Sequence, residues 1–213
     1  MLRLDRWDKL SLGALAISAA YTAAVYPSLP EKVPIHFDIH GVADGFAPRA
    51  AGAVLLPAIA LFTWAIVRLG HRIMPPGTRD RMKASPMSAV GAVVVVPFAL
   101  LHMLILRLAK SGGHELGASF SVLLAGMWIA LGLLMPKLRR NPVAGIRTAW
   151  TLASDENWAR THRAGGIACT IAGFIALPFA LGGSVAAPIV AILASALFAL
   201  GYSFVAAHRE RQA

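Results

Sequence analysis

The stretch AGGIACTIAGFIALPFALGGSVAAPIVAILASALFALGYSFVAA, residues 164–207, contains no Asp, Glu, Lys or Arg over 44 residues. As one helix it would be about 66 Å long, roughly twice the hydrocarbon thickness of a bilayer. A Gly182-Gly183 pair lies near its middle, and glycine pairs are turn signals. The stretch is therefore predicted to fold back as two membrane-spanning helices, residues 164–181 and 185–207.

Four more charge-free runs precede this pair, at residues 10–26, 50–67, 84–106 and 116–136. Hydrophobic residues make up 57% of the 213-residue chain and charged residues only 14%, against about 25% charged in soluble domains. These values exclude a disordered chain and argue against a soluble domain. We predict an all-α integral membrane protein, with six transmembrane helices in a single domain over residues 1–213. One cysteine excludes an internal disulfide and a cysteine-cluster metal site.

The first run has an alternative reading as a secretory signal peptide, because basic residues precede it and small residues end it. Its apolar stretch is longer than the 7–15 residues of a signal peptide, and Asp5 and Asp8 dilute its basic start. We predict that this helix is retained.

Lys and Arg are divided unevenly between the two sides that six spans define. Sixteen of the 20, including Arg3 and Arg211, fall on the side that holds both termini. By the positive-inside rule both termini are predicted to be cytoplasmic. The net charge of +10 then faces anionic lipid, so we expect membrane lipids and no nucleic acid as partners.

The first outer loop, residues 27–49, reads PSLPEKVPIHFDIHGVADGFAPR. Apolar residues alternate with others from residue 33 to 40, which predicts a short strand-like segment with one polar face. Gly41 ends this segment, and Asp44-Gly45 predicts a tight turn.

The polar face of that segment carries His36, Asp38 and His40 at alternate positions. Imidazole and carboxylate groups on one face are suited to a divalent metal such as zinc. Three such residues without a fourth ligand are also typical of a hydrogen-bonded loop that binds no metal, and we favour that reading. His102 is predicted about one turn from the outer end of its span.

The long inner loop, residues 137–163, reads KLRRNPVAGIRTAWTLASDENWARTHR. Ser154 before two acidic residues predicts a helix N-cap, with a helix from residue 155 to 163 that continues into the fifth span. Trp158 and His162 fall one turn apart on this helix. The loop is either an interfacial anchor of Trp and Arg side chains or, because threonines lie close to the arginines, a polar pocket at the membrane face.

Both loops carry a family resemblance. Residues 29–37 (LPEKVPIHF), with Gly41 and Asp44-Gly45, resemble the LPxxIPxHFxxxGxxDG element of a bacterial membrane domain of unknown function. The inner loop resembles the second signature of the SdpI family. Two departures concern the outer element: Asp38 stands where the family usually has Asn, and His40 stands at a variable position. Both weaken the case for a shared metal site.

The resemblance implies a multispanning protein of the bacterial inner membrane that protects the cell from a toxic peptide. In the founding member it also senses the toxin and recruits a transcriptional repressor. The outer candidate ligand-binding residues are His36, Phe37, Asp38, Gly41, Asp44 and Gly45. The inner ones are Asn141, Gly145, Arg147, Thr148, Trp150, Thr151, Ser154, Trp158, Thr161, His162 and Arg163.

We therefore expect an immunity or receptor protein, with a toxin peptide or envelope ligand outside and a protein partner in the cytoplasm. It would have no catalytic residue and no cofactor. The alternative is a membrane-embedded enzyme with His36, Asp38 and His40 as metal ligands, or a transporter. A transporter should bury charges midway in its spans, and none of the six runs has one.

The chain also has a two-part order. Spans one to three and four to six each consist of a helix, a long loop and two helices, which predicts either an inverted repeat or a coincidence of order.

Overall fold

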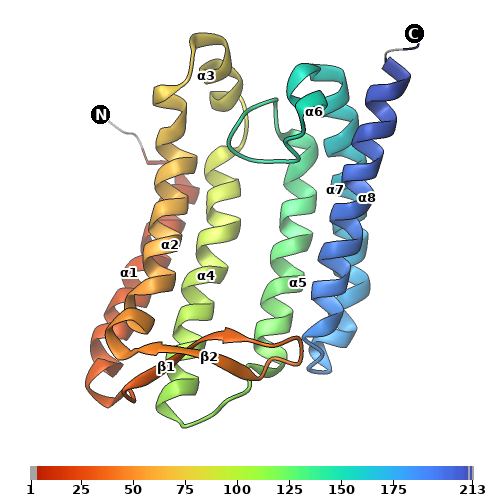
Figure 1. The fold of residues 1–213 in the computed structure, drawn as a ribbon. Helices are drawn as coiled ribbons and strands as arrows, with labels where there is room; N and C mark the ends of the chain where they lie inside the picture. The colour runs from red at the N-terminus through yellow and green to blue at the C-terminus, as the bar shows by residue number, and fades with distance from the viewer. Residues whose placement is uncertain (1–3, 211, 213) are drawn as a thin grey trace.

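The computed structural model describes residues 4–210 and 212, so Arg3 and Arg211 lie outside the described residues. It confirms the predicted helical membrane architecture, because six helices are long and apolar enough to cross a bilayer (Figure 1). These are α1 (Arg6–Val25), α2 (Arg49–Leu69), α4 (Met87–Lys110), α5 (Gly117–Leu134), α7 (Asp155–Leu181) and α8 (Ala186–Glu210). The shorter elements are β1 (Lys32–Phe37), β2 (Ala43–Pro48), α3 (Pro76–Lys83), α6 (Ala149–Ala153) and 3-10 turns at Tyr26–Ser28, Gly70–Ile73 and Met135–Lys137.

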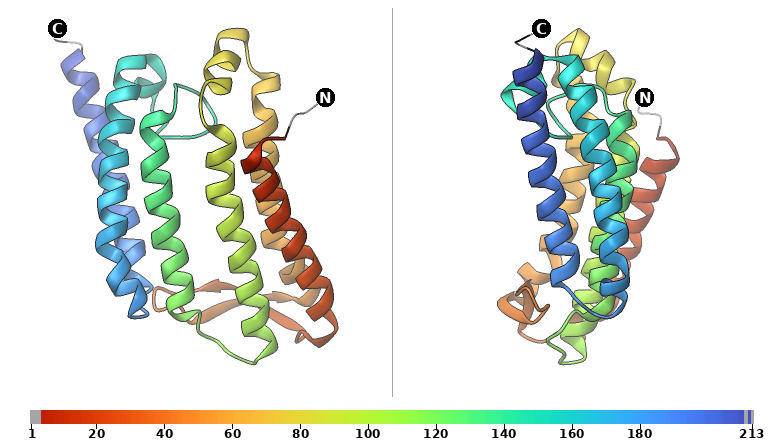
Figure 2. Two further views of the ribbon diagram at one scale, coloured as in Figure 1. Left: turned by 180° about the vertical axis from the view of Figure 1, so that it is seen from behind. Right: turned by 90° about the vertical axis from the view of Figure 1, so that its right-hand side faces the viewer.

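The helices form two halves of three. Helix α4 packs against α1 and α2, whereas α7 packs against α5 and α8, and the halves meet mainly along α4 and α5. The start of α1 and the end of α8 lie at one end of the bundle together with α3 and α6, and the hairpin of β1 and β2 crosses the other end (Figures 1 and 2). After the orientation predicted from the charge distribution, we call these the inner end and the outer end.

The hairpin differs from the sequence-based expectation in its second strand. Strand β1 covers the first part of the predicted strand-like segment but ends at Phe37, so Asp38 and His40 lie outside it, and Asp44 and Gly45 lie inside β2 rather than in a tight turn. The turn is formed by residues 38–42, where Gly41 has a φ of 82° and its N–H donates to the Asp38 carbonyl. Gly45 pairs with His36 so closely that a β-carbon at position 45 would lie 2.8 Å from the His36 β-carbon, which favours glycine there.

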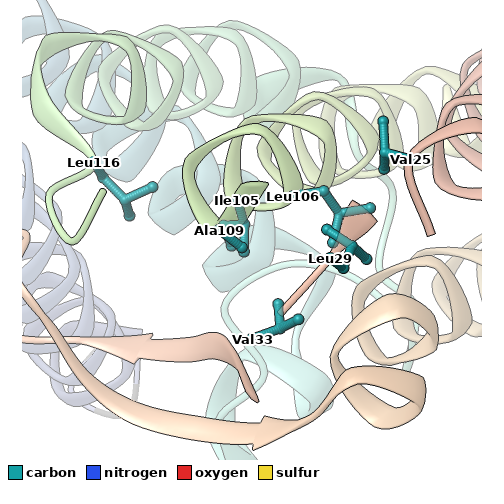
Figure 3. Close-up of a cluster of buried hydrophobic side chains, with 7 residues drawn as sticks. All are labelled: Val25, Leu29, Val33, Ile105, Leu106, Ala109 and Leu116. Atoms are coloured by element: carbon teal, nitrogen blue, oxygen red, sulfur yellow. The ribbon is translucent and has the colours of Figure 1, made fainter. Parts of the chain in front are cut away.

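A buried apolar cluster holds the hairpin on the helices (Figure 3). Val33 is completely buried and lies in the same cluster as Leu29 and, from α4, Leu106. The close fit requires Gly52 at the start of α2, since an added β-carbon would lie 2.6 Å from the Val33 β-carbon.

The hairpin tip is attached to the second half. The Leu116 N–H donates to the Gly41 carbonyl at 3.0 Å, and the Ala43 N–H donates to the His114 carbonyl at 2.7 Å. Gly41 also packs so tightly on Val185, just before α8, that an added β-carbon would lie 2.7 Å from a Val185 methyl. One hairpin thus contacts both halves of the bundle.

The last two spans fold back as predicted. Ser154 caps α7 by accepting the Asn157 N–H at 3.0 Å, and the helix continues without a break to Leu181. Gly183, with a φ of 91°, then reverses the chain. Helices α5 and α7 approach closely because glycines face each other: a β-carbon at Gly166 would lie 2.7 Å from the Gly132 carbonyl oxygen.

Candidate functional site

The exposed face of the hairpin carries an ion pair. His36 Nδ1 lies 2.5 Å from Asp44 Oδ1, and both side chains are largely exposed. Asp38 has a different role, because its Oδ1 accepts the N–H groups of His40 and Val42 and so stabilises the turn. The Val42 hydrogen bond in particular lowers the pKa of Asp38 below its usual value.

These contacts differ from the arrangement that the metal alternative predicts, in which His36, Asp38 and His40 share one face. In residues 4–210 and 212, no group of three or more His, Cys, Asp or Glu side chains is placed to hold a metal ion. The ladder of β1 is irregular on both sides of His36, which breaks the alternating face that the sequence predicts for His36, Asp38 and His40. The Asp38 oxygen is already bonded to its own turn. The difference from the sequence-based expectation therefore concerns the strand register, which residue spacing alone does not reveal.

The hairpin also exposes apolar side chains. Ile35, Ile39 and Phe46 are each between 42% and 50% exposed. Phe37, the remaining outer candidate with a large side chain, packs partly against the buried cluster below. The hairpin therefore exposes both apolar and charged side chains, and we call this exposed set the hairpin face: Ile35, His36, Ile39, Asp44 and Phe46.

At the inner end, Asn141 organises the start of the long loop. Its Oδ1 accepts the N–H groups of Val143 and Ala144, both at 2.9 Å, while its Nδ2 donates to the Arg139 and Ala144 carbonyls. The side chain is 1% exposed, so all its bonding serves the loop.

Trp158 and His162 lie one turn apart on α7 and stack on each other, with ring centroids 3.9 Å apart. The Trp158 indole N–H donates to the Leu138 carbonyl at 2.8 Å. His162 Nε2 accepts the Ile146 N–H at 3.0 Å, so Nδ1 carries the proton and donates to the Trp158 carbonyl. Both side chains are buried and bind the loop to the helix.

The hydroxyl groups of the loop are also engaged internally. Thr148 and Thr151 form a reciprocal cap at the start of α6, and the Thr151 hydroxyl also contacts the Ile146 carbonyl. Thr161 donates to the side chain of Asn157, which reaches the Ser203 carbonyl of α8.

Trp150 is bound in the same way, because its indole N–H donates to the Ser203 hydroxyl at 2.9 Å. The predicted hydroxyl groups thus line the interior of the loop rather than an open pocket.

Several arginines of the inner loop are among its exposed residues. Arg140 is partly covered and forms a bidentate contact with Asp155. Arg147 is exposed, and within residues 4–210 and 212 its guanidinium donates to the Pro142 carbonyl. Arg163 is exposed as well. These two guanidinium groups are available to an external partner.

A buried ion pair near the inner end was not predicted from the sequence. Asp8 of α1 is 1% exposed, lies 2.8 Å from Arg68 Nε of α2, and accepts the Trp64 indole N–H. A cavity of about 300 Å³ adjoins it, lined in part by Arg68, His71 and Lys83. Opposite charges at the inner ends of two consecutive spans were the signal available in the sequence.

One buried histidine lies deeper than expected. His102 is 1% exposed, and its Nε2 contacts the Thr22 hydroxyl of α1 at 2.9 Å. Because α4 continues to Lys110, His102 lies about two turns from the outer end of its helix, not one.

Comparisons with known proteins agree with this architecture. Residues 13–61 match the model of a domain of unknown function (DUF1648), which covers the hairpin and parts of α1 and α2. Residues 137–205 match the SdpI/YfhL protein family and cover the inner loop, α7 and most of α8. The predicted resemblance is therefore confirmed.

One relative is the uncharacterized membrane protein YbgB of Bacillus subtilis strain 168, which is 34% identical over 58 residues. That match covers 27% of this chain and 64% of the relative, so the chain spans less than two thirds of the relative's length. No solved structure matches the chain. The six apolar helices and these matches show a multi-pass bacterial membrane protein.

Proposed function

We propose that this multi-pass membrane protein of the SdpI family is an immunity or receptor protein that meets a toxic peptide or another envelope ligand at its hairpin face. The hairpin would lie outside the cell and both termini in the cytoplasm, in agreement with the excess of Lys and Arg at the inner end. The observation that carries the proposal is a hairpin attached to both halves of the bundle that still exposes apolar side chains beside an ion pair.

The hairpin face is complementary to an amphipathic peptide. Such peptides place apolar side chains on one face and basic ones on the other, and they accumulate at the membrane surface. Ile35, Ile39 and Phe46 offer apolar contact at that level. Asp44 offers a carboxylate whose position is fixed by His36, so a basic group on the peptide would replace or join the imidazole.

The attachment of the hairpin provides a route to the inner end. Gly41 contacts Leu116 and Val185, which directly precede α5 and α8. Helices α7 and α8 in turn hold the inner loop through Trp158 and Ser203. A ligand that displaces the hairpin tip would therefore change how α7 and α8 pack against the inner loop. Arg147 of that loop is exposed to a cytoplasmic protein partner.

The test is a double variant of the hairpin face, Ile39→Ser with Phe46→Ser. We expect it to insert and unfold like the wild type but to lose at least about tenfold in affinity, because two half-exposed apolar contacts are removed. Binding is measured by titrating membrane-active amphipathic peptides into nanodiscs that hold the full chain, and protection by growth of expressing cells under the same peptides. His40→Ala, an exposed change at the tip, is the control. Unchanged binding and protection in the double variant would contradict the proposal.

A further inference from the structure

Helices α7 and α8 border a groove of about 470 Å³ near the inner end. We call it the α7–α8 groove; its lining includes Arg160, Arg163 and Ile167 of α7 and Tyr202 of α8. The three α7 residues recur at intervals of three and four, so they form one face of that helix. The groove is separate from the hairpin face, which lies at the opposite end of the bundle (Figure 1).

The charged side chains that line the groove, Arg160, Arg163 and Glu156, together carry one net positive charge. Arg160 is paired with Glu156, which also lines the groove. Arg163 is exposed, and no ion pair or hydrogen bond of its guanidinium is found in residues 4–210 and 212. Tyr202 is 37% exposed, and its ring lies near Phe198 with centroids 6.2 Å apart. A guanidinium and a phenol hydroxyl therefore share one groove.

Next to the groove, along α7 and α8, the exposed surface of the bundle is apolar. Ile167, Ile171 and Phe174 of α7 are each 54–57% exposed, and Phe198 of α8 is 52% exposed. At the level of the groove, by contrast, Trp150 and Tyr202 have the amphipathic rings that are enriched where hydrocarbon meets the headgroups. The groove thus adjoins an apolar surface that suits an acyl chain, at the end of α7 where exposed arginines replace exposed apolar side chains.

We propose that the α7–α8 groove binds an anionic phospholipid, with its phosphate on Arg163 and Tyr202 and one acyl chain along Ile167 and Phe198. The guanidinium suits a phosphate because it is always charged and donates several hydrogen bonds in one plane. An anionic headgroup is favoured over a zwitterionic one, because Arg160 is paired with Glu156 and the remaining charge of Arg163 attracts a lipid of net negative charge. The proposal does not depend on the toxin or on the proposed function of the hairpin.

The experiment compares thermal unfolding of the purified full-length chain in detergent with and without added lipid. Phosphatidylglycerol should raise the Tm of the wild type, since a ligand that binds the folded state stabilises it, whereas phosphatidylcholine should raise it less. Arg163→Gln should remove more than about half of that shift, and Tyr202→Phe should remove a smaller part. Arg72→Gln is the matched control, because Arg72 is an exposed arginine at the same end of the other half.

Three results would overturn the proposal: no shift specific to phosphatidylglycerol in the wild type, equal losses in Arg163→Gln and Arg72→Gln, or an equal shift with inorganic phosphate alone. The first two would show no selective site, and the third would assign a free-anion site. If Arg163→Gln unfolds, Arg163→Lys keeps the charge and native mass spectrometry counts retained phosphatidylglycerol directly. The number of retained phosphatidylglycerol molecules could be the same in Tyr202→Phe, Arg163→Lys, Arg72→Gln and the wild type. That result would also contradict the proposed groove.

Discussion

Gly145 lies so close to His162 that a β-carbon at position 145 would overlap the imidazole Nε2. Gly145 has a φ of 118°, and the next residue, Ile146, donates its N–H to that same nitrogen at 3.0 Å. The backbone of the inner loop and the stacked pair of His162 and Trp158 are therefore positioned by each other.

We expect Gly145→Ala to destabilise the protein for two reasons, the collision with His162 and a backbone conformation that costs an L residue about 1–3 kcal/mol. Thermal unfolding in detergent measures the effect as a lower Tm. Gly13→Ala is the control, because an added β-carbon at Gly13 meets nothing within 4 Å. Equal Tm values for the two variants would show that the loop adapts to the side chain.

Trp158→Phe should cost about 1–3 kcal/mol, because it leaves the Leu138 carbonyl without its buried indole donor. Chemical or thermal unfolding measures this loss.

Arg147→Ala should leave stability within about 0.5 kcal/mol of the wild type, as exposed changes usually do. Our proposed function predicts that Arg147→Ala nevertheless reduces protection or signalling. A variant at Arg147 that retains full function would limit the loop to a structural role.

Asp8→Asn should be strongly destabilising, by about 3 kcal/mol, because it removes the ion-pair partner of a largely buried guanidinium. Arg68→Met in the same chain should recover part of the loss, since the pair is then replaced by uncharged groups. Asp80→Asn, at an exposed position of α3, is the matched control. A full double-mutant cycle of Asp8 and Arg68 gives the coupling energy, and a value near zero would refute the importance of the pair.

The orientation is tested by cysteine labelling in Cys169→Ser protein. We expect a cysteine at Ser28 to react with an impermeant reagent applied to intact cells, and a cysteine at Ala153 to react only after permeabilisation. Both positions are exposed, at the outer and inner ends respectively. The reverse pattern would invert the topology and the receptor proposal with it.

His36→Ala should weaken ligand binding, whereas His40→Ala should have a mild effect. The His36 imidazole holds the Asp44 carboxylate at 2.5 Å, and His40 lies at the turn. Exposed ion pairs contribute little to folding, so the Tm of both variants should stay close to the wild type. Peptide titration in nanodiscs is the readout. Equal and severe losses, with stoichiometric zinc in the purified protein, would instead favour the metal-dependent enzyme.

The features that followed from the sequence are those that depend on neighbouring residues. Charge-free runs of sufficient length gave the six helices, Gly182-Gly183 gave the turn, and Ser154 before Asp155 gave the start of α7. Each rests on a local property: hydrocarbon thickness, glycine backbone freedom or helix capping.

The features that escaped prediction depend on pairing across the chain. Strand β2 contains Asp44, Gly45 and Pro48, which individually disfavour strands, and it forms because β1 and the helices below provide partners. Asp8 and Arg68 are 60 positions apart, and the register of His36 depends on an irregular ladder. The sequence also indicated threonines near the arginines of the inner loop, but not that Thr148 and Thr151 bond to each other.

The contact of Gly41 with Val185 has a consequence for biogenesis. In the proposed orientation, the hairpin tip is translocated before α5, α7 and α8 exist. Its base can dock once α4 is inserted, through Val33 and Leu106, and its tip can bond to His114 and Leu116 as α5 begins, but the contact of Gly41 with Val185 must wait for the start of α8. Insertion of α8 therefore completes the outer surface, and a chain arrested before α8 would lack this last contact of the tip.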